Sequence, residues 1–346
     1  ARVKRLTVGI TLASMAAFGI GWTFSFMTPM LAASFLAAPI PRPPLKALVM
    51  MPVMILVAFT LALMVSAFGL SLPFLAILSV SLLIFRCFYS LARGVARMFT
   101  MWALIGTLLI PVVSLKGMGV AVSLTVAIFW SGMAAMAFVW LAFALVPDPQ
   151  GVVVAAKKKQ AGGMGNLYAA AKFAFVRTIV ILPIVSFILL TEGTSQLKIL
   201  IFSAMLSMNP ALEKGPKGAM GLVTANLVGG GISLVFYELQ TMCPSLIFLC
   251  LQFLLLCLVF GREIFSGGKF AGLFSSALGT VILLFGLGVM PIGDDTGSNF
   301  YVRILHLLIA AVYVAFAFQV VSYYANWRIR RAIKRRRKLE AAAAAA

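Results

Sequence analysis

The sequence has little charge, and acidic residues are especially scarce. Asp and Glu together number 8 among 346 residues, and there is 1 histidine. All charged residues make up 10% of the chain, whereas hydrophobic residues make up 63%. Soluble domains carry about 25% charged residues, so this chain has too few of them to cover a water-facing surface. An ordinary soluble protein is therefore excluded.

Cysteine and catalytic motifs are also sparse. The chain has 4 cysteines, and three of them, Cys243, Cys250 and Cys257, recur every seven residues on one face of a predicted helix. In such a helix they pack as small apolar groups, and no cluster of histidines or carboxylates lies near them to complete a metal site. Phosphate-loop, zinc-protease and serine-hydrolase signatures are absent as well. The sequence predicts no enzyme, no metal and no cofactor.

Long apolar runs are what the sequence has in abundance. The runs 47–70, 117–146 and 270–290 carry no charge and reach or exceed the ~20 residues that span a bilayer. Hydrophobic runs and the breakers between them define twelve predicted spans: 6–22, 24–38, 46–70, 72–88, 98–114, 118–146, 169–190, 196–209, 218–239, 243–260, 268–290 and 300–326. We predict an all-α, polytopic protein of the lipid bilayer with about twelve transmembrane helices. The second and eighth spans are short, so whether they cross the bilayer fully stays open.

Basic residues predict the orientation of the spans. The formal net charge is +20, and residues 328–338 form a basic tail directly after the last span. With a cytoplasmic N-terminus, 25 of the 28 Lys and Arg residues fall on the inner side, and only Lys116, Lys198 and Arg303 fall outside. We therefore predict that both termini are cytoplasmic. A basic cluster next to a span binds anionic headgroups, so nucleic acid is not a predicted partner.

The chain divides into two similar halves. The predicted units are a first six-span half at 1–146, a cytoplasmic linker at 147–167, a second six-span half at 168–327, the basic tail at 328–338, and a remnant of an expression tag at 339–346. Three pairs of residues correspond between the halves at offsets of 172 to 181 positions: Arg5 with Arg177, Pro29 with Pro210, and Arg86 with Arg262. Because each half has an even number of spans, the halves are parallel repeats, a plan known among transporters.

A few polar residues within the predicted spans are candidates for a substrate or proton path. Glu238 ends the ninth span about two turns after the glycines 229–231. Gly229, Gly230 and Gly231 would allow a hinge beside a protonatable group, or alternatively the close packing of another helix. His306 titrates near neutral pH and would relay protons, although a lone histidine is more often a packed residue. Arg303 lies one turn before it and would hold an anion on the outer side.

Arg86 and Arg262 are the inner-side candidates. They occupy corresponding places at the inner ends of the fourth and tenth spans. Arginine holds a carboxylate in a bidentate fork, so the pair would line a vestibule for anionic substrates. The alternative is that both arginines only anchor the topology by their positive charge. Pro29 and Pro210 are expected to bend or end the second and eighth spans.

The sequence resembles the fusaric acid resistance and aromatic acid exporter superfamily. The resemblance rests on RLTVG at 5–9, GWTFSFMTP at 21–29, MNP at 208–210, KGAMG at 217–221 and NLVGG at 226–230, and it extends over residues 5–327. The chain is most similar to a compact branch that has both six-span halves and little soluble mass. It departs from the larger exporters because it lacks a large cytoplasmic domain.

The resemblance implies an efflux component of the bacterial inner (cytoplasmic) membrane. Such a component exports aromatic carboxylic acids or similar toxic organic compounds, using the proton gradient. Its implied partners are a periplasmic membrane-fusion (adaptor) protein, an outer-membrane channel and a small organic anion substrate, and a homo-oligomer stays open. Two alternatives stand beside this interpretation: a non-transporting membrane scaffold for an adaptor protein, and a passive anion channel.

Overall fold

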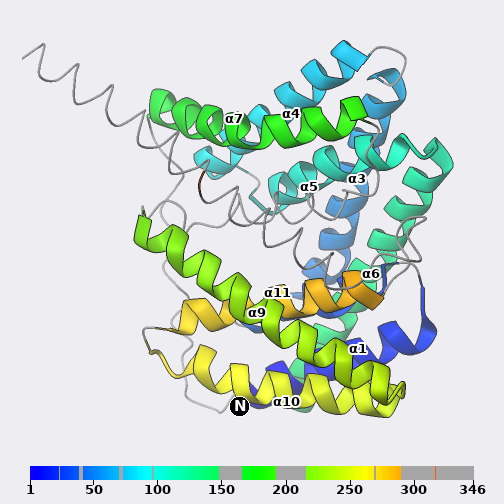
Figure 1. The fold of residues 1–346 in the computed structure, drawn as a ribbon, viewed down its shortest axis with the longest axis vertical. Coiled ribbons are helices and arrows are strands. Elements are labelled where there is room, and N and C mark those ends of the chain that lie inside the picture. The colour runs from blue at the N-terminus through cyan, green and yellow to red at the C-terminus, as the bar shows by residue number, and fades with distance from the viewer. Residues whose placement is uncertain are drawn as a thin grey trace, which may run out of the picture.

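A computed structural model describes residues 1–22, 24–38, 42–69, 73–95, 97–147, 166–191, 216–268 and 270–289, together with Phe316. Within these ranges all regular structure is helical (Figure 1). The helices are α1 (Arg2–Ile20), α2 (Met27–Leu36), α3 (Leu45–Gly69), α4 (Pro73–Arg93), α5 (Arg97–Ser114), α6 (Met118–Leu145), α7 (Leu167–Thr191), α9 (Pro216–Met242), α10 (Leu246–Phe265) and α11 (Ala271–Val289).

Several helices have the length and composition of membrane spans. In the described part of the chain, 6 stretches are long and apolar enough to cross a bilayer: Arg2–Ile20, Leu48–Ala67, Phe74–Arg93, Met118–Leu145, Leu167–Phe187 and Leu246–Phe265. The apolar parts of α2, α5 and α11 are shorter, at 10–17 residues. The expectation of a multi-pass helical membrane protein is confirmed. The predicted spans 196–209 and 300–326 lie outside the described residues, so the total of twelve stays a prediction.

Three helices end at least three residues later than the sequence pattern predicted: α4, α9 and α10, of which α10 continues to Phe265 instead of ending at residue 260. The fourth span was expected to end at residue 88, but α4 continues to Arg93, because residues 89–92 contain no helix breaker. It ends there because Gly94 adopts the left-handed conformation, with φ 70°, and the N–H of Val95 turns back to the carbonyl of Ser90. The ninth span was expected to end at residue 239, whereas α9 continues to Met242. Both Arg86 and Glu238 therefore lie inside helices.

The second predicted span is only partly helical. Helix α2 has 10 residues, which at 1.5 Å per residue gives ~15 Å, about half of the hydrocarbon core. A tight turn precedes it, in which Gly21 and Phe24 have φ of 70° and 62°. Pro29 lies in the first turn of α2, where a missing N–H costs nothing, so it does not break the helix.

The helices pack around two hydrophobic clusters. The first cluster is built mainly from α3, α4, α5 and α7, and the second from α1, α9, α10 and α11. Helices α2, α6 and α11 contribute to both, and Phe18, Met30 and Phe35 pack against both. Figure 1 shows α4 and α7 at one end of the long axis and α10 at the other, with α3 and α6 between them.

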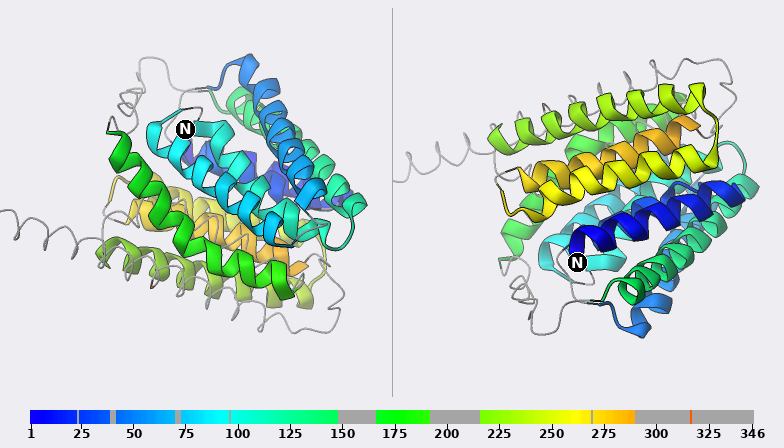
Figure 2. Two further views of the ribbon diagram at one scale, coloured as in Figure 1. Left: turned by 90° about the horizontal axis from the view of Figure 1, so that it is seen from above. Right: turned by 90° about the horizontal axis from the view of Figure 1, so that it is seen from below.

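The first helix of each predicted half packs in the cluster that is built mainly from the other half. Helix α1 packs on α10, and α7 packs on α4 (Figure 2). Gly261 lies in the contact between α1 and α10, where a Cβ atom would lie 3.1 Å from Leu6 Cδ2 and 3.2 Å from Val3 Cγ1, closer than most contacts of this kind. Within the clusters, α3 packs on α5 and α9 on α11.

The contacts also establish the relative direction of neighbouring helices. Val3 contacts Gly261, whereas Leu246 lies against Gly19, so α1 and α10 run antiparallel. Arg5, at the start of α1, donates from Nε to the carbonyl of Val146 at the end of α6, so these two helices are antiparallel as well. The basic N-terminus of α1 and the C-termini of α6 and α10 therefore lie at the same end of the molecule.

Candidate functional site

A cavity of about 490 Å³ lies between α3, α4 and α5. Helix α3 contributes one wall, α4 the second, and α5 with the preceding turn the third. The lining residues are Ala58, Leu61, Ala62, Met64, Val65, Leu83, Arg86, Cys87, Ser90, Val95, Phe99, Thr100, Ala103 and Thr107. Arg86 is the single charged residue among them, and binding pockets for small molecules typically measure about 300–1,000 Å³. We refer to this space as the Arg86 cavity.

The polar residues that line the Arg86 cavity favour the binding of an anion next to Arg86. The Thr107 hydroxyl donates to the carbonyl oxygen of Ala103 at 2.7 Å, and that of Thr100 donates to Val95 at 3.2 Å. Both hydroxyl hydrogens are therefore engaged within the helix and the turn. Arg86 remains as the strong donor, and its planar fork suits a carboxylate. Phe99 supplies an aromatic surface in the same lining.

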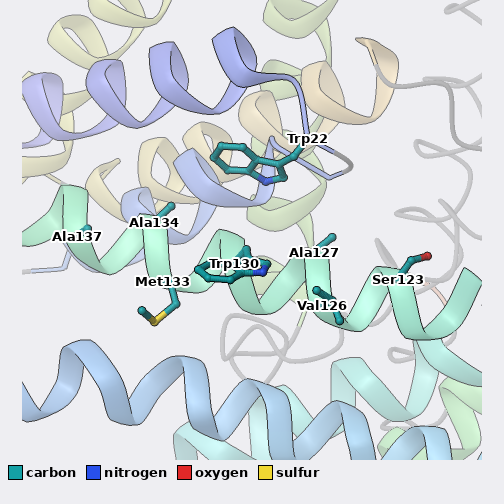
Figure 3. Close-up of a pocket in the computed structure, with 8 residues that line it drawn as sticks. All are labelled: Trp22, Ser123, Val126, Ala127, Trp130, Met133, Ala134 and Ala137. Atoms are coloured by element: carbon teal, nitrogen blue, oxygen red, sulfur yellow. The ribbon is translucent and has the colours of Figure 1, made fainter.

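A second pocket of about 720 Å³, with no charged residue in its lining, lies along α6. Figure 3 shows its lining: Trp22, Ser123, Val126, Ala127, Trp130, Met133, Ala134 and Ala137. All but Trp22 belong to one face of α6, whereas Trp22 comes from the turn after α1. We refer to this space as the Trp22–Trp130 pocket. Its two indole rings suit a flat apolar or aromatic group.

Each indole ring of this pocket has a neighbour that orients it. Trp22 donates its indole N–H to the Ser131 hydroxyl oxygen at 3.0 Å, which fixes the turn against α6. Trp130 is 59% exposed and stacks edge-on with Phe129, with ring centroids 5.7 Å apart. Trp22 is therefore held by a polar contact, while the Trp130 face stays open to a ligand.

The predicted site residues that the structure describes do not lie together in one cavity. Arg86 lines a cavity, whereas Arg262, although exposed near the end of α10, lines neither of the two cavities. Glu238 is half-buried on α9, one turn before its end, and also lies outside both. His306, Arg303 and Pro210 lie outside the described residues.

The three glycines of α9 have different surroundings. A Cβ atom on Gly229 would lie 2.8 Å from Thr280 Cβ and 2.9 Å from the carbonyl oxygen of Ala277, so this glycine lies in the tight contact between α9 and α11. Gly230 is buried, whereas a Cβ atom on Gly231 would meet open space. Helix α9 runs through all three without a break. The packing alternative therefore accounts for Gly229.

Carboxylates are few in the described ranges. Only Glu238 and Glu263 occur there, and each lies within one turn of a helix C-terminus. Among the residues described, no group of three His, Cys, Asp or Glu side chains could hold a metal ion.

Sequence reasoning missed the tryptophans and the threonines of the two cavities. Trp22 stands in the GWTFSFMTP segment, and Trp130 lies in the middle of a span rather than at its interfacial end, where tryptophan is usually enriched. That position is the one signal in the sequence that singles it out. Thr100 and Thr107 have no comparable signal.

Comparison of the chain with protein-family models, curated proteins and solved structures finds no match.

Proposed function

We propose that the protein is a secondary efflux transporter that exports small organic anions, aromatic carboxylic acids foremost, across the bacterial inner membrane. The observation that carries this proposal is the Arg86 cavity, where one arginine faces a space of about 490 Å³ together with Phe99. A carboxylate paired with Arg86 and a ring beside Phe99 would use both features. The Trp22–Trp130 pocket offers a second aromatic surface for the same class of compound.

The proposal includes a twelve-span, two-repeat architecture with both termini in the cytoplasm. The packing pattern supports it: if each helix is replaced by the one six places later or earlier, the pair α1–α10 becomes α7–α4, and α3–α5 becomes α9–α11. Both exchanged pairs are present. Arg5 and Arg177 are both buried, and each lies over a phenylalanine ring, which agrees with the same correspondence, although Arg5 is in the first turn of α1 and Arg177 is near the middle of α7.

The proposed partners follow from the resemblance of the sequence. A periplasmic adaptor protein and an outer-membrane channel would carry the exported anion across the remaining envelope, and a proton gradient would drive the step. The outer loops predicted from the sequence are short. An adaptor would therefore dock on helix ends or laterally on the spans.

One observation favours a passive anion channel as the second candidate. Proton-driven carriers usually keep an acidic residue within the membrane, whereas the described carboxylates, Glu238 and Glu263, lie near helix ends. A channel needs only a positively charged path such as Arg86 would provide. A scaffold for an adaptor protein is a third role; it needs no anion site and would leave the Arg86 cavity without a use.

The test is flux in proteoliposomes that contain the purified protein. We expect uptake or release of labelled benzoate that collapses when the pH gradient is removed, and a loss of at least ten-fold in Arg86→Gln. Arg262→Gln is the matched control, because it removes the same charge from the corresponding position. Flux that follows only the electrochemical gradient of benzoate, with single-channel conductance, would indicate the channel. No flux from inserted protein would contradict both.

A further inference from the structure

The Arg86 cavity has an apolar rim that faces away from the protein interior. Leu61 and Met64, both on α3, line it and are 50% and 57% exposed. On α4, Leu78 and Leu82 lie about two turns and one turn before Arg86 and are 69% and 67% exposed. In a multi-pass membrane protein, exposed leucine and methionine at the level of the spans contact lipid chains. The exposed residues of the cavity lining are Leu61 and Met64 on α3, Arg86 on α4, and Val95 in the turn after α4.

Arg86 lies well before the end of α4. It precedes the end of α4 by seven residues, or ~10 Å at 1.5 Å per residue. The hydrocarbon core is about 30 Å thick. If α4 crosses the bilayer and ends at its surface, the backbone of Arg86 therefore lies within one leaflet and not in water. The side chain is exposed, and no hydrogen bond or ion pair joins it to another described residue. A cation in this setting is costly without a counter-charge.

We propose that the Arg86 cavity takes amphiphilic monocarboxylates from the cytoplasmic leaflet, through the gap between α3 and α4. The carboxylate pairs with Arg86, and the apolar body extends past Leu61 and Met64 into the lipid. This inference rests on the proposed function, because it assigns the substrate class and the access route of the anion site. The source of the ligand is the bilayer, where such compounds accumulate, and not the aqueous phase.

The features of the cavity fit a single-chain acid better than a phospholipid. A single arginine provides one positive charge, and two of the three hydroxyl groups of the lining, those of Thr100 and Thr107, are already engaged with Val95 and Ala103, while Ser90 carries the third. A volume of about 490 Å³ accommodates a ring or a short chain.

The experiment is equilibrium binding to the full-length protein in phosphatidylcholine nanodiscs. The probes are radiolabelled benzoate, 4-butylbenzoate and 4-octylbenzoate, which share one carboxylate and differ in how strongly they enter the bilayer. We expect the Kd, calculated from the aqueous concentration of each probe, to decrease from benzoate to 4-butylbenzoate to 4-octylbenzoate. The decrease should be proportional to the increase in the membrane partition coefficient. Arg86→Gln should weaken binding of every probe at least ten-fold, Arg86→Lys less so, and Arg262→Gln not at all.

A photoreactive diazirine at the chain end of 4-octylbenzoate gives a positional readout. We expect crosslinks to peptides that contain Leu61, Met64 or Leu82, and their loss in Arg86→Gln. Equal affinity for benzoate and 4-octylbenzoate, or crosslinks confined to α5, would overturn the sideways route. Displacement by added phosphatidylglycerol would overturn the choice of a single-chain acid. Because binding is measured without a gradient, absent flux with intact binding would count against the proposed function alone.

Discussion

The Arg5 guanidinium lies 3.9 Å from the centre of the Phe143 ring, and its Nε donates to the Val146 carbonyl oxygen at 3.1 Å. One buried side chain thereby joins the first turn of α1 to the last turn of α6. It satisfies a terminal carbonyl that has no partner within its own helix. The cation also lies over an aromatic face, which favours arginine over lysine.

Replacement of Arg5 by glutamine should destabilise the protein. The change leaves the Val146 carbonyl without this donor, and hydrogen bonds to charged groups contribute about 1.5–3 kcal/mol. We expect a lower midpoint of thermal unfolding in detergent, measured by circular dichroism. Lys4→Gln removes the same charge from an exposed neighbour and should have almost no effect. Equal midpoints for the two variants would contradict the anchoring role of Arg5.

The glycines of α9 offer a second matched pair. Gly229→Ala would place a methyl group against Thr280 and the Ala277 carbonyl, and overpacking of this kind costs about 1–3 kcal/mol. Gly231→Ala adds a methyl group in open space and replaces glycine by a better helix former, so it should be neutral or stabilising. Unfolding in detergent checks both variants. The reverse order of stability would mean that α9 and α11 do not meet at Gly229.

Cysteine labelling tests the orientation of the second half. Cys243 is exposed in the turn between α9 and α10, whereas Cys87 and Cys257 are buried. With a cytoplasmic N-terminus, this turn faces the periplasm. A membrane-impermeant maleimide should therefore label intact spheroplasts at Cys243, and Cys243→Ser should abolish the labelling. Labelling restricted to inverted vesicles would show that the proposed orientation is reversed.

Trp130 should discriminate aromatic from saturated acids. Its ring is 59% exposed in the Trp22–Trp130 pocket, and contacts between aromatic rings contribute about 0.5–1.5 kcal/mol beyond burial. We expect Trp130→Ala to raise the KM for benzoate several-fold in the flux assay and to change that for cyclohexanecarboxylate much less. Trp130→Phe keeps a ring and should resemble the wild type. Equal effects on both acids would assign Trp130 to general packing.

The sequence predicted the positions of the helices more accurately than it predicted which residues form the candidate site. The predicted spans 98–114 and 118–146 nearly coincide with α5 and α6, because a lysine, a glycine and a change in hydropathy mark the boundary between them. Arg86 was recognised as a candidate from its charge and from its correspondence with Arg262 in the second half. The neighbours that make a cavity around it, among them Thr107 on another helix, are brought close only by packing.

The composition and the long apolar runs already show that this chain is helical and belongs in a membrane. Long uncharged runs are stable only in lipid, and there the backbone must satisfy its own hydrogen bonds within each helix. Which helices are neighbours, in contrast, becomes known only from their packing. Lipid solvates every apolar face about equally, so hydrophobicity does not select partners, and close contacts at small residues do. The packing of α1 on α10 includes a close contact at Gly261, which no periodicity in the sequence predicts.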